Sequence, residues 1–93
     1  MSTHVSHREV WYTGRVQGVG FRAQALSVAR SYDITGFVQN LADGRVYVHV
    51  EGSGQEVDAY TEQLAKTMNG YIRTAESRDF AGVRTSTDFF IRR

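Results

Sequence analysis

Residues 14–22, with the sequence GRVQGVGFR, contain the residue types that bind a phosphate-sized anion. Glycines let a loop turn its backbone N–H groups toward one point, and a helix that follows adds the positive end of its dipole. Arg22, at the end of the segment, supplies a planar fork of donors that matches phosphate oxygens. The segment therefore predicts a local anion site that includes an arginine.

The flanking residues predict the elements that position this segment. Residues 9–16 alternate between apolar and polar side chains, which predicts a strand, and apolar residues over 21–32 recur at helical spacing. Further strands are expected at 35–40 and 46–51, joined as a hairpin by the turn that contains Asp43-Gly44. The glycine segment thus connects a strand to a helix.

The second half of the chain is expected to add a helix over 57–68, one irregular strand over 72–83 and a short closing strand near Phe89 and Ile91. This order predicts an α+β fold of the split βαβ type, with two helices on one face of a four- or five-stranded antiparallel sheet. A crossover from strand to helix to strand brings the ends of the first two strands to one edge. We therefore expect Asn40 to lie within a strand or two of Arg22.

Length and composition narrow the possible functions. The 93 residues suit a single domain, residues 1–93, and 41% hydrophobic residues can form one core. A formal charge of +1 argues against nucleic acid or a membrane surface as partner. The absence of cysteine excludes a thiolate metal site and a cysteinyl phospho-intermediate. No apolar run approaches bilayer length, so a cytoplasmic location is expected.

Three segments carry a resemblance to a known family: GRVQGVGFR, TGFVQN at 35–40 and ADGRVYVHVEG at 42–52. In residue identity and spacing, residues 10–52 resemble the acylphosphatase family. The resemblance implies a ferredoxin-like αβ sandwich that acts as a monomer and needs no metal and no cofactor. It also implies hydrolysis of the carboxyl–phosphate bond of small acyl phosphates, by direct attack of water, to a carboxylate and inorganic phosphate.

The resemblance further implies roles for individual residues. Arg22 would bind the phosphate and Asn40 would position the attacking water, and these two are the expected catalytic residues. Loop amides would complete the phosphate-binding set, which comprises Arg15, Val16, Gln17, Gly18, Val19, Gly20, Phe21 and Arg22. A bond-forming role is not expected for Gln17, which we interpret as shaping the loop.

Two alternatives stay open beside this interpretation. The first is a non-catalytic binding or regulatory module of the same fold. The second is a ferredoxin-like domain that binds RNA, although the third strand lacks the aromatic signature of such domains and carries Tyr47 as its only aromatic residue.

The histidines do not predict a metal site. His4 and His7 are expected in a frayed N-terminal segment, and His49 lies in a strand without a further ligand at metal-binding spacing. No serine or threonine stands in a visible arrangement with a histidine and an acid, so nucleophilic catalysis is not expected. The region after the second helix, which lacks proline, is less typical of the family than the first half.

Overall fold

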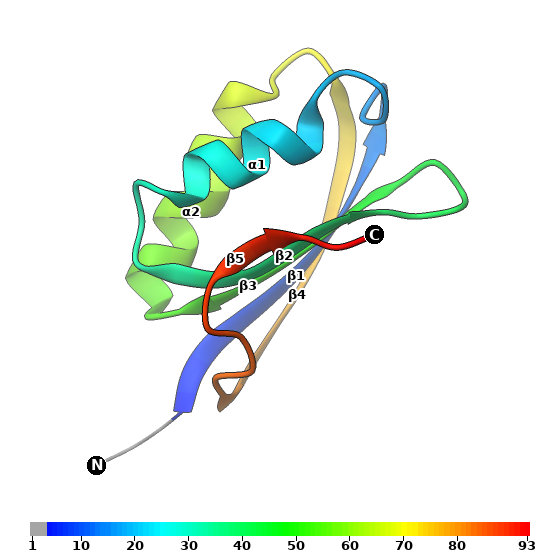
Figure 1. Ribbon diagram of the computed structural model, residues 1–93. Helices are drawn as coiled ribbons and strands as arrows, with labels where there is room; N and C mark the ends of the chain where they lie inside the picture. Colours follow the sequence, from blue (N-terminus) through cyan, green and yellow to red (C-terminus); the bar gives the residue numbers. More distant parts are fainter. Residues whose placement is uncertain (1–3) are drawn as a thin grey trace.

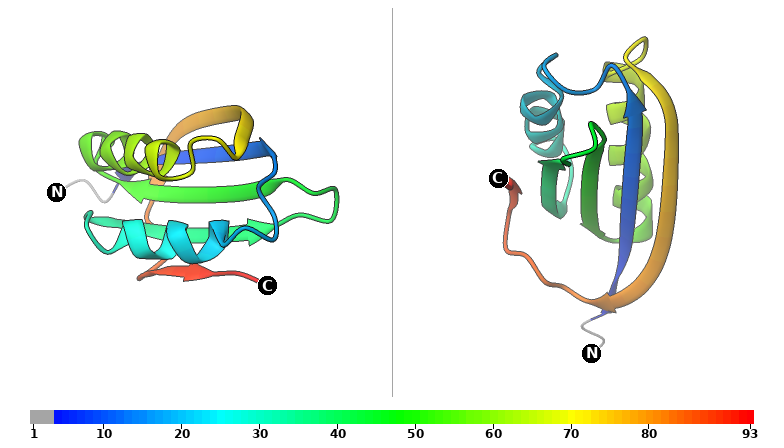
Figure 2. Two further views of the ribbon diagram at one scale, coloured as in Figure 1. Left: turned by 90° about the horizontal axis from the view of Figure 1, so that it is seen from above. Right: turned by 90° about the vertical axis from the view of Figure 1, so that its right-hand side faces the viewer.

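The computed structural model describes residues 4–93 as a five-stranded sheet with two helices on one face (Figures 1 and 2). In chain order the elements are β1 (His4–Gly14), α1 (Phe21–Ala29), β2 (Ile34–Asn40), β3 (Val46–Gly52), α2 (Gly54–Thr67), β4 (Ile72–Val83) and β5 (Phe89–Ile91). The strand order β4-β1-β3-β2-β5 places β3 between β1 and β2. This arrangement confirms the ferredoxin-like α+β fold.

The core lies between the helices and the sheet. Because successive side chains of a strand point to opposite faces, β1 buries Val10 and Tyr12 while β3 buries Val46, Val48 and Val50. The helices cover these side chains with residues at helical spacing: Phe21, Ala25 and Ala29 of α1, and Val57, Tyr60 and Leu64 of α2. From His4 to the C-terminus, no helix lies on the other face of the sheet (Figure 2).

The sheet is mixed, whereas the sequence predicted a wholly antiparallel one. β5 pairs with β2 in the parallel direction, and all other pairs are antiparallel. β4 runs antiparallel to β1 at one edge, and the chain then reverses and crosses to the opposite edge. There it necessarily runs in the same direction as β2, because β1 and β2 are both antiparallel to β3.

The segment expected to be one irregular strand is a continuous edge strand of 12 residues, β4. It pairs with β1 from His4↔Val83 to Gly14↔Ile72, with one irregularity between Thr13 and Gly14. Nearly every residue of β4 is exposed, so no buried face imposes a period of two on the sequence. Exposure on both sides explains why its apolar pattern is weak.

Expected boundaries were wrong at three elements, and α2 begins at Gly54 instead of residue 57. β1 begins at His4, not at residue 9, and His7 is only 2% exposed, because pairing with β3 on one side and β4 on the other extends β1 toward the N-terminus. α1 ends at Ala29 and not near residue 32, and Tyr32, which follows the helix, still packs against the core. Neither helix of residues 4–93 is long and apolar enough to cross a bilayer.

Candidate functional site

All three glycines of the segment have positive φ: Gly14, the last residue of β1, at 126°, and Gly18 and Gly20, which turn the chain into α1, at 79° and 81°. A Cβ at Gly18 or Gly20 would meet no atom within 4 Å, so the backbone conformation, and not the space, requires glycine there. Gly20 is the N-cap of α1, and it has no side chain to accept from the first turn, which also lacks an acidic residue. The N–H groups at the start of α1 are therefore available to an anion.

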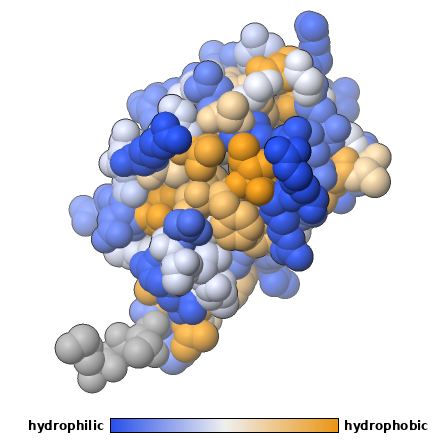
Figure 3. Space-filling model, in the orientation of Figure 1, coloured by the Kyte–Doolittle hydropathy of each residue, from blue (hydrophilic) through white to orange (hydrophobic). Residues whose placement is uncertain are grey.

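A cavity of about 220 Å³ opens beside the start of α1. The glycine loop and the first turn of α1 form one side, including Arg22, and Asn40, Ile91 and Arg93 form the other. An apolar patch lies at the centre of the face that α1 and β5 form, with hydrophilic side chains around it, including some near the C-terminus (Figure 3). The fold thus brings Arg22 and Asn40, which are eighteen positions apart in the sequence, to the same small cavity.

The side-chain oxygen of Asn40 has no hydrogen-bond partner within residues 4–93, although it is buried. Asn40 is the last residue of β2 and pairs with Val46 of β3, which fixes its backbone at the mouth of the hairpin. A buried carbonyl oxygen without a donor costs about 1–3 kcal/mol. A donor that enters the cavity, such as a water molecule, would remove this cost.

Arg22 lies half-buried in the first turn of α1. Within the described part of the chain, the arginines that pair with carboxylates are others, namely Arg8, Arg45 and Arg78. The positive end of the helix dipole repels a guanidinium at the helix N-terminus. An anion placed between the guanidinium and the helix is attracted by both of these positive groups. The cavity is therefore electrostatically suited to a small anion.

Gln17 connects the two halves of the site. Its side-chain NH2 donates to the carbonyl oxygens of Leu41 and Arg45, at 2.8 and 3.0 Å, in the β2–β3 hairpin that follows Asn40. Asp43 stiffens the same hairpin by accepting from the backbone N–H and the side chain of Arg45. The backbone hydrogen bond from Arg45 is the main reason that the pKa of Asp43 lies below its ordinary value.

Three of the expected phosphate-binding residues do not line this cavity. The backbone N–H of Arg15 donates to the carbonyl of Tyr71 at 2.8 Å, and Arg15 lines a different cavity. Val19 packs against the core, and the side chain of Gln17 is engaged by the hairpin. Val16, Gly18, Gly20, Phe21 and Arg22 do line the cavity. The roles of all these residues remain predictions.

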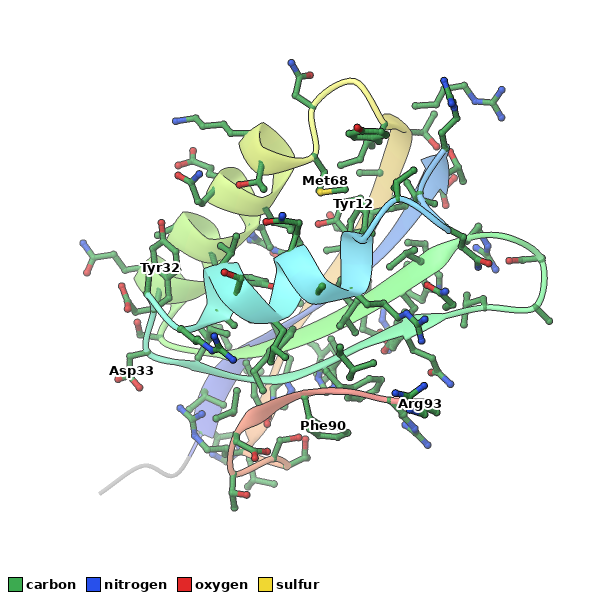
Figure 4. All side chains as sticks on the ribbon, turned by 45° about the horizontal axis from the view of Figure 1, so that its top comes forward. Tyr12, Tyr32, Asp33, Met68, Phe90 and Arg93 are labelled. Carbon is green, nitrogen blue, oxygen red and sulfur yellow. The ribbon has the colours of Figure 1, made fainter. Side chains whose placement is uncertain are left out.

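Sequence reasoning missed three residues of the cavity: Ala23 in the first turn of α1 and, near the C-terminus, Ile91 and Arg93. Figure 4 places Arg93 just beyond β5, and Ile91 is the last residue of that strand. Their position depends on the parallel pairing of β5 with β2, for which the sequence offers no local signal.

A family model described as Acylphosphatase matches residues 8–91. The chain belongs to the acylphosphatase family. The match includes β4 and β5, so the relationship extends well beyond residues 10–52, where the resemblance was first found.

Individual relatives support the same family. An acylphosphatase of Bifidobacterium longum is 41% identical over 64 residues, which are 69% of this chain and 66% of that protein. One of Chromohalobacter salexigens is 50% identical over 56 residues, which are 60% and 62% of the two chains. The alignments span somewhat more than half the length of the first curated acylphosphatases that the chain matches.

Solved structures agree over nearly the whole chain. The crystal structure of acylphosphatase from Bacillus subtilis superposes with a TM-score of 0.87 at 25% identity, covering 95% of this chain and 99% of that one. Full-length HypF in a phosphate- and nucleotide-bound form gives a TM-score of 0.79 at 30% identity. That likeness covers 94% of this chain but only 12% of HypF.

Proposed function

We propose that this protein is an acylphosphatase that hydrolyses the carboxyl–phosphate bond of small acyl phosphates, releasing a carboxylate and inorganic phosphate without a metal. One observation carries the proposal. Asn40, whose buried Oδ1 finds no hydrogen-bond partner among residues 4–93, lines the same cavity as Arg22 and the N-terminus of α1, which no side chain caps in that range.

The proposed reaction needs only positioning and charge stabilisation. The amides at the start of α1 and the Arg22 guanidinium hold the phosphoryl oxygens and reduce their repulsion toward an incoming nucleophile. Asn40 Oδ1 accepts a hydrogen bond from a water molecule and aims its oxygen at phosphorus.

As the water oxygen bonds to phosphorus, the bond to the acyl oxygen breaks and its electron pair leaves with the carboxylate. The leaving carboxylate is a stable anion, so a general acid contributes little. A phosphoryl oxygen of the substrate itself takes the proton from the water, because the neutral amide of Asn40 is a poor base.

Hydrolysis of benzoyl phosphate in the presence of a chelator tests this function. We expect turnover that the chelator does not change, and competitive inhibition by inorganic phosphate. Arg22→Lys keeps the charge but loses the fork of donors, so it should weaken phosphate inhibition and turnover together. Arg30→Lys, at the other end of α1, is the matched control and should leave both unchanged.

Two outcomes would contradict the proposal. If Arg22→Lys behaves like the wild type, the guanidinium does not bind the phosphoryl group as a fork. If wild-type protein binds inorganic phosphate but turns over no acyl phosphate, the non-catalytic binding module becomes the better description.

We also propose that residues 1–93 act as a single-domain monomer in the cytoplasm, with a small molecule as partner rather than nucleic acid or a membrane. The formal charge of +1 supports a small-molecule partner, because binding to nucleic acid or to an anionic membrane requires a strongly basic surface. Light scattering should give the monomer mass of 10.5 kDa, and a mass of twice that value would contradict a monomer.

A further inference from the structure

His7, His49 and Glu51 come together on the sheet face that carries no helix. His7 of β1 is the cross-strand partner of Glu51 in β3, and His49 lies two residues earlier on the same face of β3. Nδ1 of His7 is 3.0 Å from Nε2 of His49 and 3.4 Å from Oε2 of Glu51. His7 and Glu51 are 2% and 0% exposed. Two imidazoles and one carboxylate thus share one buried point.

The hydrogen bonds of His7 orient its ring. Nε2 of His7 lies 2.9 Å from the carbonyl oxygen of Val83. A carbonyl oxygen only accepts, so Nε2 of His7 donates to it, and Nδ1 of the same ring faces both His49 and Glu51. A cation at this point would be bound by both.

We propose that His7, His49 and Glu51 form a site for a divalent transition-metal ion of the zinc class. Zinc binds imidazole nitrogen at about 2.0–2.1 Å and carboxylate oxygen at about 2.0–2.2 Å, so neighbouring ligands of a tetrahedral ion lie about 3.3 Å apart. The separations of 3.0 and 3.4 Å from His7 Nδ1 are close to this value. One ligand atom from each residue lies within 4.8 Å of the others, and a small shift of the half-buried His49 ring would close the set.

The residues that would hold these ligands in place are present. The Glu51 carboxylate accepts from the backbone N–H of Thr85 at 2.9 Å and from that of Ser86 at 2.7 Å. The carbonyl of Val83 holds the ring of His7. Metal-binding histidines and carboxylates are usually oriented by such outer hydrogen bonds. Phe80 stacks on His7 with ring centroids 4.7 Å apart and so also holds that ring, and the ion could keep a water as its fourth ligand.

This site is separate from the cavity that contains Arg22 and Asn40. Asn40 pairs with Val46 at one end of β3, whereas Glu51 pairs with Thr35 near the other end. The three ligands also lie on the opposite face of the sheet from the helices. The ion would therefore stabilise the fold without taking part in hydrolysis, and the proposal is compatible with turnover that a chelator does not change.

Calorimetric titration of untagged, metal-free protein with Zn²⁺ tests the site. We expect one ion per chain and a higher melting temperature with Zn²⁺ than with a chelator. Co²⁺, used as a probe, should give the intense visible absorption of a four-coordinate ion with nitrogen and oxygen ligands. Absence of stoichiometric Zn²⁺ binding to the wild type would overturn the proposal without reference to any variant.

Substitutions then identify the ligands. His49→Gln and Glu51→Gln should each lower the affinity for Zn²⁺ by ~100-fold or more, since the loss of a ligand exceeds the loss of an outer hydrogen bond. His4→Gln, which removes a histidine outside the cluster, should bind Zn²⁺ like the wild type. Hydrolysis of benzoyl phosphate with chelator should be unchanged in His49→Gln. Zn²⁺ binding by folded His49→Gln equal to that of the wild type would show that the ion binds elsewhere.

Discussion

Asn40→Ala should lower the rate of catalysis without lowering the stability of the fold. The side-chain oxygen of Asn40 is buried and has no donor in the described part of the chain, which costs about 1–3 kcal/mol in the folded protein. Alanine removes this oxygen, together with a small amount of packing at the end of β2. We therefore expect the free energy of unfolding to stay the same or to rise by up to about 1 kcal/mol.

The same substitution removes the group that aims the attacking water. Loss of one preorganised hydrogen-bonding group in an active site typically lowers kcat by about 10²–10³, or about 2.7–4 kcal/mol of transition-state stabilisation. The affinity for inorganic phosphate should change little, because Arg22 and the amides of α1 remain. Steady-state hydrolysis of benzoyl phosphate, phosphate inhibition and urea denaturation measure the three quantities on one protein preparation.

Gln39→Ala is the matched control, since Gln39 precedes Asn40 in β2 and points to the other face of the sheet. It should leave kcat unchanged. The reasoning is refuted by a different pair of results. In that case the free energy of unfolding of Asn40→Ala is lower than that of the wild type by more than about 1.5 kcal/mol, and kcat falls only in proportion to the fraction of folded protein. Asn40 would then be a structural cap of the hairpin.

Three further substitutions test the structure around the site. Gly20→Ala should lower the free energy of unfolding by about 1–2 kcal/mol, because φ of 81° is unfavourable for alanine even though its Cβ meets no atom; urea denaturation measures this. Tyr60→Phe removes a buried hydrogen bond, 3.0 Å long, to the carbonyl of Ala25, and the same assay should show a loss of about 0.5–1.5 kcal/mol. Hydrogen bonding to Arg8 is the main cause of the lowered pKa of Asp79 in the folded protein. The pair therefore stabilises the fold at pH values above the pKa of about 4 that Asp79 has in the unfolded chain. This stabilisation is lost as the pH falls through the lower pKa of Asp79 in the folded protein. Asp79→Asn should therefore cost less than about 1 kcal/mol at pH 7 and nothing near pH 2, as melting curves at both pH values would show; an equal cost at both would refute the electrostatic origin.

The elements that surround the glycine segment were predictable because each has a strong local pattern. The alternation of Val46, Val48 and Val50 specified β3 and its buried face, and the Asp-Gly turn specified the hairpin to β2. The crossover rule then brought Arg22 and Asn40 to the same end of the sheet, and the structure places both at one cavity.

The prediction failed where a side chain's surroundings depend on distant strands. His7 lies among polar residues and was expected in a frayed segment, but pairing with β3 and β4 buries it against His49 and Phe80. The signal that could have revealed the cluster is the His-X-Glu spacing of residues 49–51, which puts both side chains on one face of a strand. Its third member is visible only once the register of β1 is known.

The segment after β4 connects the two sites. β5 has only three paired residues, so its position depends on bonds at its ends, where Gly36 donates to the Asp88 carbonyl and Arg92 to the Val38 carbonyl. Glu51 holds the preceding loop, by accepting from the backbone of Thr85 and Ser86. Since β5 supplies one wall of the cavity, the geometry of that wall rests on a carboxylate on the far face of the sheet. A buried glutamate at this position is therefore expected to matter for the site even though it contacts no substrate.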